Sequence, residues 1–234
     1  MISELKDHLV SIAIGVRFGP NFSVEDHLGR IVDSILYSKD SFFNPAMFSS
    51  VVSDGEKRLY NEKTLDSLSI NNSNIILRIH FPGQKTVKDI QEINDRFDRD
   101  IVNGVIKEFK IARISRLGYI RSYKFVEKEL QKALIDRLVG KTSSIVSALN
   151  VRFSKKYVTP EAIVSKGVND YSNAIYTVVK EADADDVLIS IDYQNYFDPP
   201  LDTVSQANFP DFIKKVEAYN SRSFLEWLKR QHSQ

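Results

Sequence analysis

Carboxylates gather in the C-terminal third of this chain, and they are the side chains best suited to chemistry. Between residues 181 and 202 no lysine or arginine interrupts them, and the set is Glu181, Asp183, Asp185, Asp186, Asp192, Asp198 and Asp202. Carboxylate oxygens bind hard cations, and many nucleases use them to hold a catalytic metal. Asp186, Asp192 and Gln194 are the residues we would assign to such a metal, but these nucleases place a lysine where Gln194 stands. A solvated acidic turn is the simpler interpretation, so we expect no metal and no other cofactor.

A basic segment, residues 107–124, carries the opposite charge. Its basic and aromatic members are Lys107, Lys110, Arg113, Arg116, Tyr119, Arg121, Tyr123 and Lys124. Basic side chains bind phosphates and aromatic rings stack on bases, so this composition suits single-stranded nucleic acid. The alternative is internal pairing with the acidic segment, within one sheet or across a dimer interface. The formal net charge is only +1, which gives no overall attraction to a polyanion, so we favour internal pairing.

A third candidate site comes from the polar sides of the strand-like segments. Alternating patterns put one side of a strand on a core and the other in solvent. If these segments share one sheet, their outward residues form a cationic surface around one aspartate: Arg17, Arg78, His80, Arg152, Lys156, Asp192 and Gln194. Such a surface would bind an anionic ligand or an acidic partner. An ordinary solvated sheet face is the alternative.

Other motifs fail on spacing or context. Residues 139–142, VGKT, resemble the end of a phosphate-binding loop, but Ile135 stands where the motif needs glycine and the segment follows a helical pattern. The four histidines, His8, His27, His80 and His232, lack the spacing of metal ligands. No serine, histidine and acid occur in a context that suggests a nucleophile. We therefore favour a protein that is not an enzyme.

Composition is that of an ordinary globular protein. Of its 234 residues, 42% are hydrophobic and 27% are charged. The chain has no cysteine, which excludes disulfides and fits a reducing compartment. The first residues, MISELKDHLV, carry charges where a signal peptide needs an apolar run, and no apolar window reaches the ~18 residues of a membrane span. We expect a single cytoplasmic domain, 1–234, away from membranes.

Periodicity predicts the elements that must position these residues. Alternation predicts strands at 8–18, 111–123, 145–157, 171–179 and 187–197, and turn residues predict hairpins around Asp54-Gly55 and Asn71-Asn72. Helical stripes follow Ser23 and cover 86–109, 126–138 and 209–228. We expect Ser23 to cap its helix, Gly118 to mark a bulge, and the prolines at 199 and 200 to end strand pairing. The apolar side of 187–197 should meet the aromatic stripe that ends at Trp227.

The order of these elements predicts an α+β fold. Each half reads strand, helix, about three strands and long helix, which predicts a curved antiparallel sheet packed by long amphipathic helices. The two halves would be β-α-β-β-β-α pseudo-repeats, 1–109 and 110–234, in a saddle-like or helix-grip-like arrangement. The exposed edges of such a sheet also favour a homodimer.

Three stretches are similar to a known family. VSIAIGVRF (10–18), RLGYIR (116–121), and VLISIDYQNYF (187–197) with the helix after it resemble an uncharacterised family of sporadically distributed bacterial proteins of about this length. Gly118 and Ser190 depart from its pattern, which has arginine and aspartate there. The resemblance implies fold and length and supplies no catalytic residue. It implies a binding or accessory protein of a bacterial system, such as defence, with a protein partner. Nucleic-acid binding and a metal-dependent nuclease are the alternatives.

Overall fold

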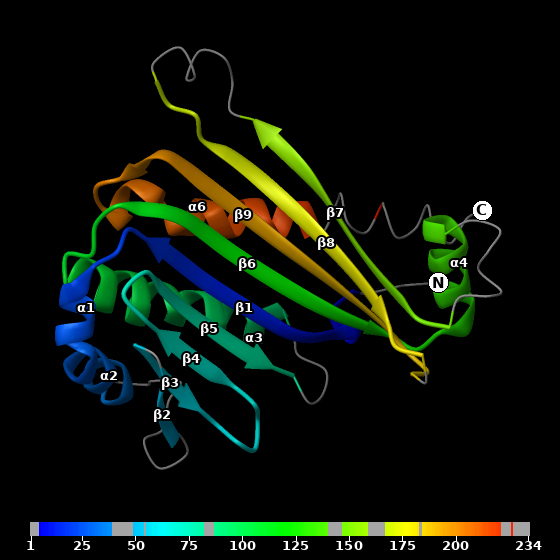
Figure 1. Ribbon diagram of the computed structural model, residues 1–234, viewed down its shortest axis with the longest axis horizontal. Coiled ribbons are helices and arrows are strands. Elements are labelled where there is room, and N and C mark those ends of the chain that lie inside the picture. The colour runs from blue at the N-terminus through cyan, green and yellow to red at the C-terminus, as the bar shows by residue number, and fades with distance from the viewer. Residues whose placement is uncertain are drawn as a thin grey trace.

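The computed structural model describes residues 5–38, 49–53, 55–81, 87–139, 147–158, 167–182, 184–220 and 226. These residues form an α+β fold, as the periodicity predicted. One curved antiparallel sheet that does not close on itself has helices packed against it (Figure 1).

The strands agree with the alternating segments of the sequence. They are β1 (Leu9–Phe18), β2 (Ser49–Ser53), β3 (Glu56–Tyr60), β4 (Ser67–Ile70), β5 (Asn74–His80), β6 (Ile114–Phe125), β7 (Leu149–Val158), β8 (Tyr171–Lys180) and β9 (Val187–Leu201). Both predicted hairpins, β2–β3 and β4–β5, are present. Gly55 has φ +76°, the backbone conformation that glycine tolerates best, at the β2–β3 turn. Residue 54 and Ile145 lie outside the described residues.

The helices agree with the predicted stripes in position but differ in detail. They are η1 (Leu5–His8), α1 (Phe22–Asp26), α2 (Leu28–Leu36), α3 (Val87–Arg96), η2 (Phe97–Lys107), α4 (Lys128–Val139), η4 (Val204–Ala207) and α6 (Phe209–Ala218). η1 and η4 are 3₁₀ helices, and η2 continues α3 as a π-helix, with wider turns than an α-helix. In the described residues no helix combines the length and the apolar character needed to cross a membrane.

The strand order places β1 and β6 at the centre of the sheet. It runs β2-β3-β4-β5-β1-β6-β9-β8-β7, with neighbours antiparallel. On either side of the central pair the chain adds its later strands in reverse order, β5-β4-β3 beside β1 and β9-β8-β7 beside β6. Two units with the same element order would produce this arrangement when their first strands pair. The pseudo-repeats 1–109 and 110–234 stay a prediction.

The core lies between the sheet and the helices α3, η2 and α6, which run behind the sheet in Figure 1. The apolar side of β9 meets α6 as predicted, since the ring of Tyr193 lies 6.2 Å from that of Phe212 and 5.2 Å from that of Tyr219. Phe97 of η2 meets Phe209 of α6 at 5.3 Å. Trp227, the predicted end of this stripe, lies outside the described residues.

Three local predictions are wrong. Asn21, not Ser23, caps the first helix, because its Oδ1 accepts a hydrogen bond from the Ser23 amide at 3.1 Å. Gly118 pairs regularly with its neighbours, and the irregularity of β6 lies between Ile114 and Arg116. The prolines at 199 and 200 do not end β9, since Leu201 pairs again with Ile114. The extra residues of β9 fall within this irregularity, so the prolines need not donate to the ladder.

Candidate binding site on the open face of the sheet

The side of the sheet opposite the helices is called the open face here. Ile14 points into the core and pairs with Leu77 and Tyr119, so its neighbours on β1 and their partners point to the open face. The same alternation and register place all seven predicted surface residues on this face: Arg17, Arg78, His80, Arg152, Lys156, Asp192 and Gln194. The structure thus brings this set together, and its role in binding stays a prediction.

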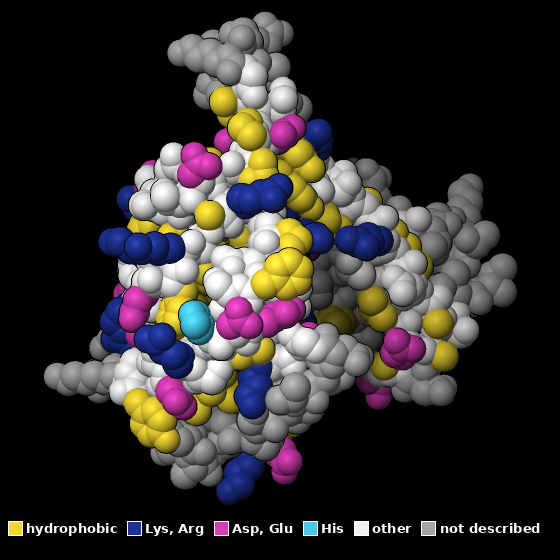
Figure 2. All heavy atoms as spheres, turned by 60° about the vertical axis from the view of Figure 1, so that its left-hand side comes forward, with side chains coloured by type: hydrophobic (Ala, Val, Ile, Leu, Met, Phe, Trp, Pro, Cys, Tyr) yellow, Lys and Arg dark blue, Asp and Glu magenta, His cyan; other side chains and the backbone are white. Residues whose placement is uncertain are grey.

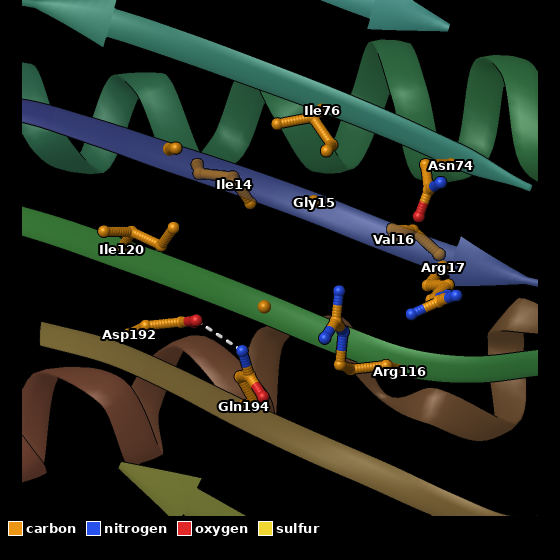
Figure 3. A pocket seen from close by; sticks show the side chains of 12 residues that line it. Ile14, Gly15, Val16, Arg17, Asn74, Ile76, Arg116, Ile120, Asp192 and Gln194 are labelled. Atoms are coloured by element: carbon orange, nitrogen blue, oxygen red, sulfur yellow. Dashed lines mark hydrogen bonds between the residues drawn. The ribbon is translucent and has the colours of Figure 1, made fainter. Parts of the chain in front are cut away.

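The floor of the open face lacks side chains at its centre. Gly15 of β1 pairs with Gly118 of β6, and the row continues to Ile76 on one side and Gln194 on the other. Figure 3 shows Arg17, Arg116 and Asp192 around this bare strip. A hollow of about 80 Å³ lies there.

Two larger hollows continue the depression across the face. One of about 410 Å³ lies among Ala13, His80, Arg152 and Asp192, and another of about 370 Å³ lies over β3, β4 and β5. The two share Arg78 and His80, and the first shares Ala13 and Asp192 with the central hollow. The open face therefore carries three neighbouring hollows that share lining residues across the central strands.

Positive charge predominates on this face. Arg17 lies directly opposite Arg116, with Arg78, Arg152 and Lys156 farther out on β5 and β7. Figure 2 shows basic and acidic side chains interspersed at the end of the molecule that carries α1 and α2. Because the whole chain has a net charge of only +1, the grouping of cations on the open face is local.

Asp192 is the carboxylate at the centre of the open face. Its Oδ2 accepts a hydrogen bond from the Gln194 side chain, and its buried Oδ1 has no hydrogen-bond partner in the described part of the chain. Burial raises the pKa of the Asp192 carboxyl above its ordinary value, although Gln194, Arg116 and Arg152 act in the opposite direction.

A stack of cations and rings fixes two of the basic groups. Lys156 Nζ lies 3.9 Å from the ring centre of Tyr171, and Tyr171 stacks on Tyr196 at 4.6 Å with an interplanar angle of 13°. The guanidinium carbon of Arg116 lies 5.6 Å from the ring centre of Tyr196, and Arg116 Nη1 donates to its hydroxyl at 3.3 Å. We call these four residues the cation–tyrosine stack. Sequence reasoning missed both tyrosines, although each lies at an outward position of an alternating strand.

The basic segment 107–124 does not form one surface. Arg116 and Lys124 point to the open face, whereas Lys107 lies on η2 and Lys110 and Arg113 lie in the connection to β6. Tyr119, Arg121 and Tyr123 lie on the helix-covered face and are only 1%, 7% and 2% exposed. Stacking of bases on Tyr119 and Tyr123 is therefore excluded in this structure, because strand alternation turns these rings into the core.

The predicted internal pairing is present. β6 pairs along its length with β9 in the same sheet, and Lys124 forms an ion pair with Asp186. This pairing also separates the proposed metal ligands. Asp186 is engaged by Lys124, and Asp192 lies six residues farther along an extended strand, about 20 Å away.

The described residues of the acidic segment do not come together as a metal site. Glu181, Asp185, Asp198 and Asp202 are exposed, as expected of a solvated turn, and Asp183 lies outside the described residues. Within the described ranges, no three histidine or acidic side chains are arranged to hold a metal ion. The distance between Asp186 and Asp192 speaks against the alternative in which these two residues and Gln194 hold one metal ion.

No protein-family model matches this chain, and the search of curated proteins found no match. The similarity to the sporadically distributed bacterial family therefore stays a resemblance, and function is argued from the site.

Proposed function

We propose that this chain is a non-enzymatic binding protein that holds an acidic segment of a protein partner on its open face. The observation that carries the proposal is the charge of that face. One carboxylate, Asp192, lies on this face with five basic residues: Arg17, Arg78, Arg116, Arg152 and Lys156. None of these five basic residues forms an ion pair with a carboxylate in the described part of the chain. Grouped cations attract and orient an acidic partner.

The dimensions of the face suit an extended or helical segment. Arg78 on β5 and Arg152 on β7 are separated by five strand spacings, which is about 24 Å at the usual distance between strands. A helix of about 16 residues has this length. The bare floor at Gly15 and Gly118 lets a partner approach the backbone of the central strands.

The cation–tyrosine stack favours a protein over single-stranded nucleic acid. Binding of single strands without sequence preference depends on free ring faces for the bases. Tyr171 is covered by Tyr196 and by Lys156, which comes from the opposite neighbouring strand. Arg116 covers Tyr196 from the other side. The rings therefore hold cations in place and offer little surface to a base.

Two parts of the proposal rest on other grounds. A role as an accessory component of a bacterial system, such as defence, rests on the family resemblance alone. A homodimer formed by strand pairing would use an edge of the sheet, β2 or β7. Arg152, Lys155 and Lys156 on β7 oppose the pairing of two β7 edges, because like charges would meet.

A direct test uses a fluorescein-labelled glutamate peptide of about 16 residues, the length derived above. Its fluorescence anisotropy is measured with the native protein and with the double variant Arg78→Glu, Arg152→Glu. The variant should bind the peptide at least about tenfold more weakly, a loss of about 1.4 kcal/mol. The matched control is Lys107→Glu with Lys215→Glu, which changes the net charge equally but on exposed helical residues. This control should keep most of the affinity.

Two outcomes would overturn the proposal. Equal losses in both double variants would show that net charge alone decides binding. An oligothymidylate of equal charge that binds more tightly than the peptide at the same salt concentration would point to nucleic acid instead.

A further inference from the structure

A second cavity lies on the opposite side of the sheet, between α3 and α6 and above β6. Its volume is about 540 Å³, within the range of small-molecule sites. Leu9, Ile90 and Ile213 give it an apolar wall, and Arg121, Glu217 and Asn220 supply polar groups. The cavity is separate from the open face, because it lies among the helices.

Arg121 is an unusual residue for this position. It pairs with Ile12 and Ile191 in the sheet, points into the helix-covered face, and is only 7% exposed. A buried charge is costly unless it is paired and hydrogen-bonded. Glu217 of α6 forms an ion pair with Arg121 Nη2, but Nε is buried with no hydrogen-bond partner among the described residues.

Asn220 lines the same cavity and is likewise incompletely satisfied. It is 5% exposed, and its Oδ1 is buried without a partner in the described part of the chain. Buried side-chain polar atoms nearly always have a hydrogen-bond partner. The unpaired Arg121 Nε is a donor that a carboxylate on a ligand would satisfy, whereas the unpaired Asn220 Oδ1 calls for a donor that a simple carboxylate does not carry.

We propose that this cavity binds a small amphipathic carboxylate. The ligand's carboxylate would pair with the guanidinium of Arg121, because the two planar groups match in geometry. The ligand's apolar chain would lie against Leu9, Ile90 and Ile213. The Glu217 side chain is 46% exposed, and it forms the ion pair with Arg121 when the cavity is empty. On binding, Glu217 turns to solvent at little cost in desolvation, and the ligand's carboxylate replaces it.

The charges around the cavity favour a carboxylate over a phosphate. Asp95 and Glu217 line the cavity together with Arg121 and Lys214, so a dianion would meet two carboxylates there. A ligand with a single carboxylate would instead form the same ion pair with Arg121 that Glu217 forms in the empty cavity.

The experiment uses octanoate as the probe, titrated calorimetrically into the whole chain. Octanol and octylamine serve as neutral and cationic probes of equal length. Octanoate should bind at one site at least about tenfold more tightly than octanol, a difference of about 1.4 kcal/mol. Arg121→Met should remove this preference, and Ile213→Trp should abolish binding because the indole projects from the apolar wall into the space that the ligand's chain would occupy. Glu217→Gln should tighten octanoate binding severalfold, because it removes the competing charge.

The open-face variant Arg78→Glu, Arg152→Glu should bind octanoate normally, which separates this proposal from the proposed function. Absence of octanoate binding to the native chain would overturn it. So would octanoate binding that is no tighter than octanol binding, or that survives Ile213→Trp. If Arg121→Met fails to fold, the opposite effects expected for Glu217→Gln and Ile213→Trp still decide the question.

Discussion

Gly15 of β1 and Gly118 of β6 pair directly across the centre of the sheet and leave its open face bare at that point (Figure 3). The two glycines differ in the space around them. A Cβ at Gly15 would lie 3.3 Å from the Ile76 side chain, whereas a Cβ at Gly118 would meet nothing within 4 Å. A Cβ can therefore be added at Gly118 without a close contact, and a longer side chain there would extend over the floor.

Gly118→Leu should keep the fold and block the open face. Glycine weakens a strand interior, so we expect thermal stability to be unchanged or slightly higher. Affinity for the glutamate peptide should fall by about tenfold, or 1.4 kcal/mol, because the leucine occupies the floor. Gly29→Leu on α2, where a Cβ also meets nothing within 4 Å, is the control and should bind normally. Undiminished peptide binding by Gly118→Leu would place the partner elsewhere.

The contact between Lys156 and Tyr171 should be measurable in a double-mutant cycle. Lys156→Met and Tyr171→Leu are made singly and together, and unfolding in urea is followed by circular dichroism. A cation lying over a ring at an exposed site contributes about 0.5–1 kcal/mol, so we expect a coupling energy of this size. Strictly additive effects of the two substitutions would show that the contact contributes nothing to stability.

Asp192→Asn should stabilise the protein at neutral pH. The folded protein binds the Asp192 proton more tightly than the unfolded chain, since burial raises the pKa of this carboxyl. The contribution of Asp192 to the free energy of unfolding is therefore fully present below the pKa that this carboxyl has in the unfolded chain. It is lost as the pH rises through the pKa that the carboxyl has in the folded protein. Asparagine resembles the protonated acid, so its advantage at pH 7 should shrink steadily toward about pH 4, near the ordinary pKa of aspartate.

Denaturant unfolding at several pH values measures this difference. Peptide affinity should rise severalfold in the same variant at pH 7, since the open face loses its central carboxylate. A variant less stable than the native chain at pH 7 would show that the carboxylate's interactions with Arg116 and Arg152 outweigh the cost of its burial.

Tyr176 of β8 and Tyr219, the residue directly after α6, share a buried hydrogen bond between their hydroxyls, and the effects of removing either hydroxyl should be non-additive. Burial raises the pKa of Tyr219, so both hydroxyls stay protonated at ordinary pH. Tyr176→Phe or Tyr219→Phe alone leaves one buried hydroxyl without this partner and should cost about 1–3 kcal/mol. The double variant should cost less than the sum of the two, as measured by urea unfolding. Additive losses would mean that the two hydroxyls act independently.

Several features of the site could be predicted from alternation alone. The outward positions of Arg17, Arg78, Arg152 and Asp192 follow from the buried residues beside them on each strand. The same rule, applied to β6, separates Arg116 from Tyr119, because residues an odd number of positions apart point to opposite faces of a strand. The basic segment was instead interpreted as a linear cluster, and its two tyrosines were wrongly assigned to the surface.

Other features depend on contacts between distant parts of the chain. The acidic segment 181–202 is continuous in sequence, but an extended backbone separates Asp186 from Asp192, and Lys124 neutralises the first of them. Tyr171 stacks on Tyr196 because the β8–β9 register places them opposite each other. The sequence does not fix this register, because it does not fix the geometry of the turn between the two strands. Arg121 looked like a surface cation, and its ion pair with Glu217 and its position over the ring of Tyr119 show how the core accommodates it.

The sequence by itself determined the α+β class, most strand positions and which side chains share a face of each strand. It could do so because alternation and helical periodicity are local properties of the backbone. Strand order and register were decided only in the tertiary structure, because they depend on pairing between residues as far apart as Gly15 and Gly118. That pairing gathers the arginines of β1, β5, β6 and β7 on one side of the sheet and leaves Arg121 beside a cavity on the other.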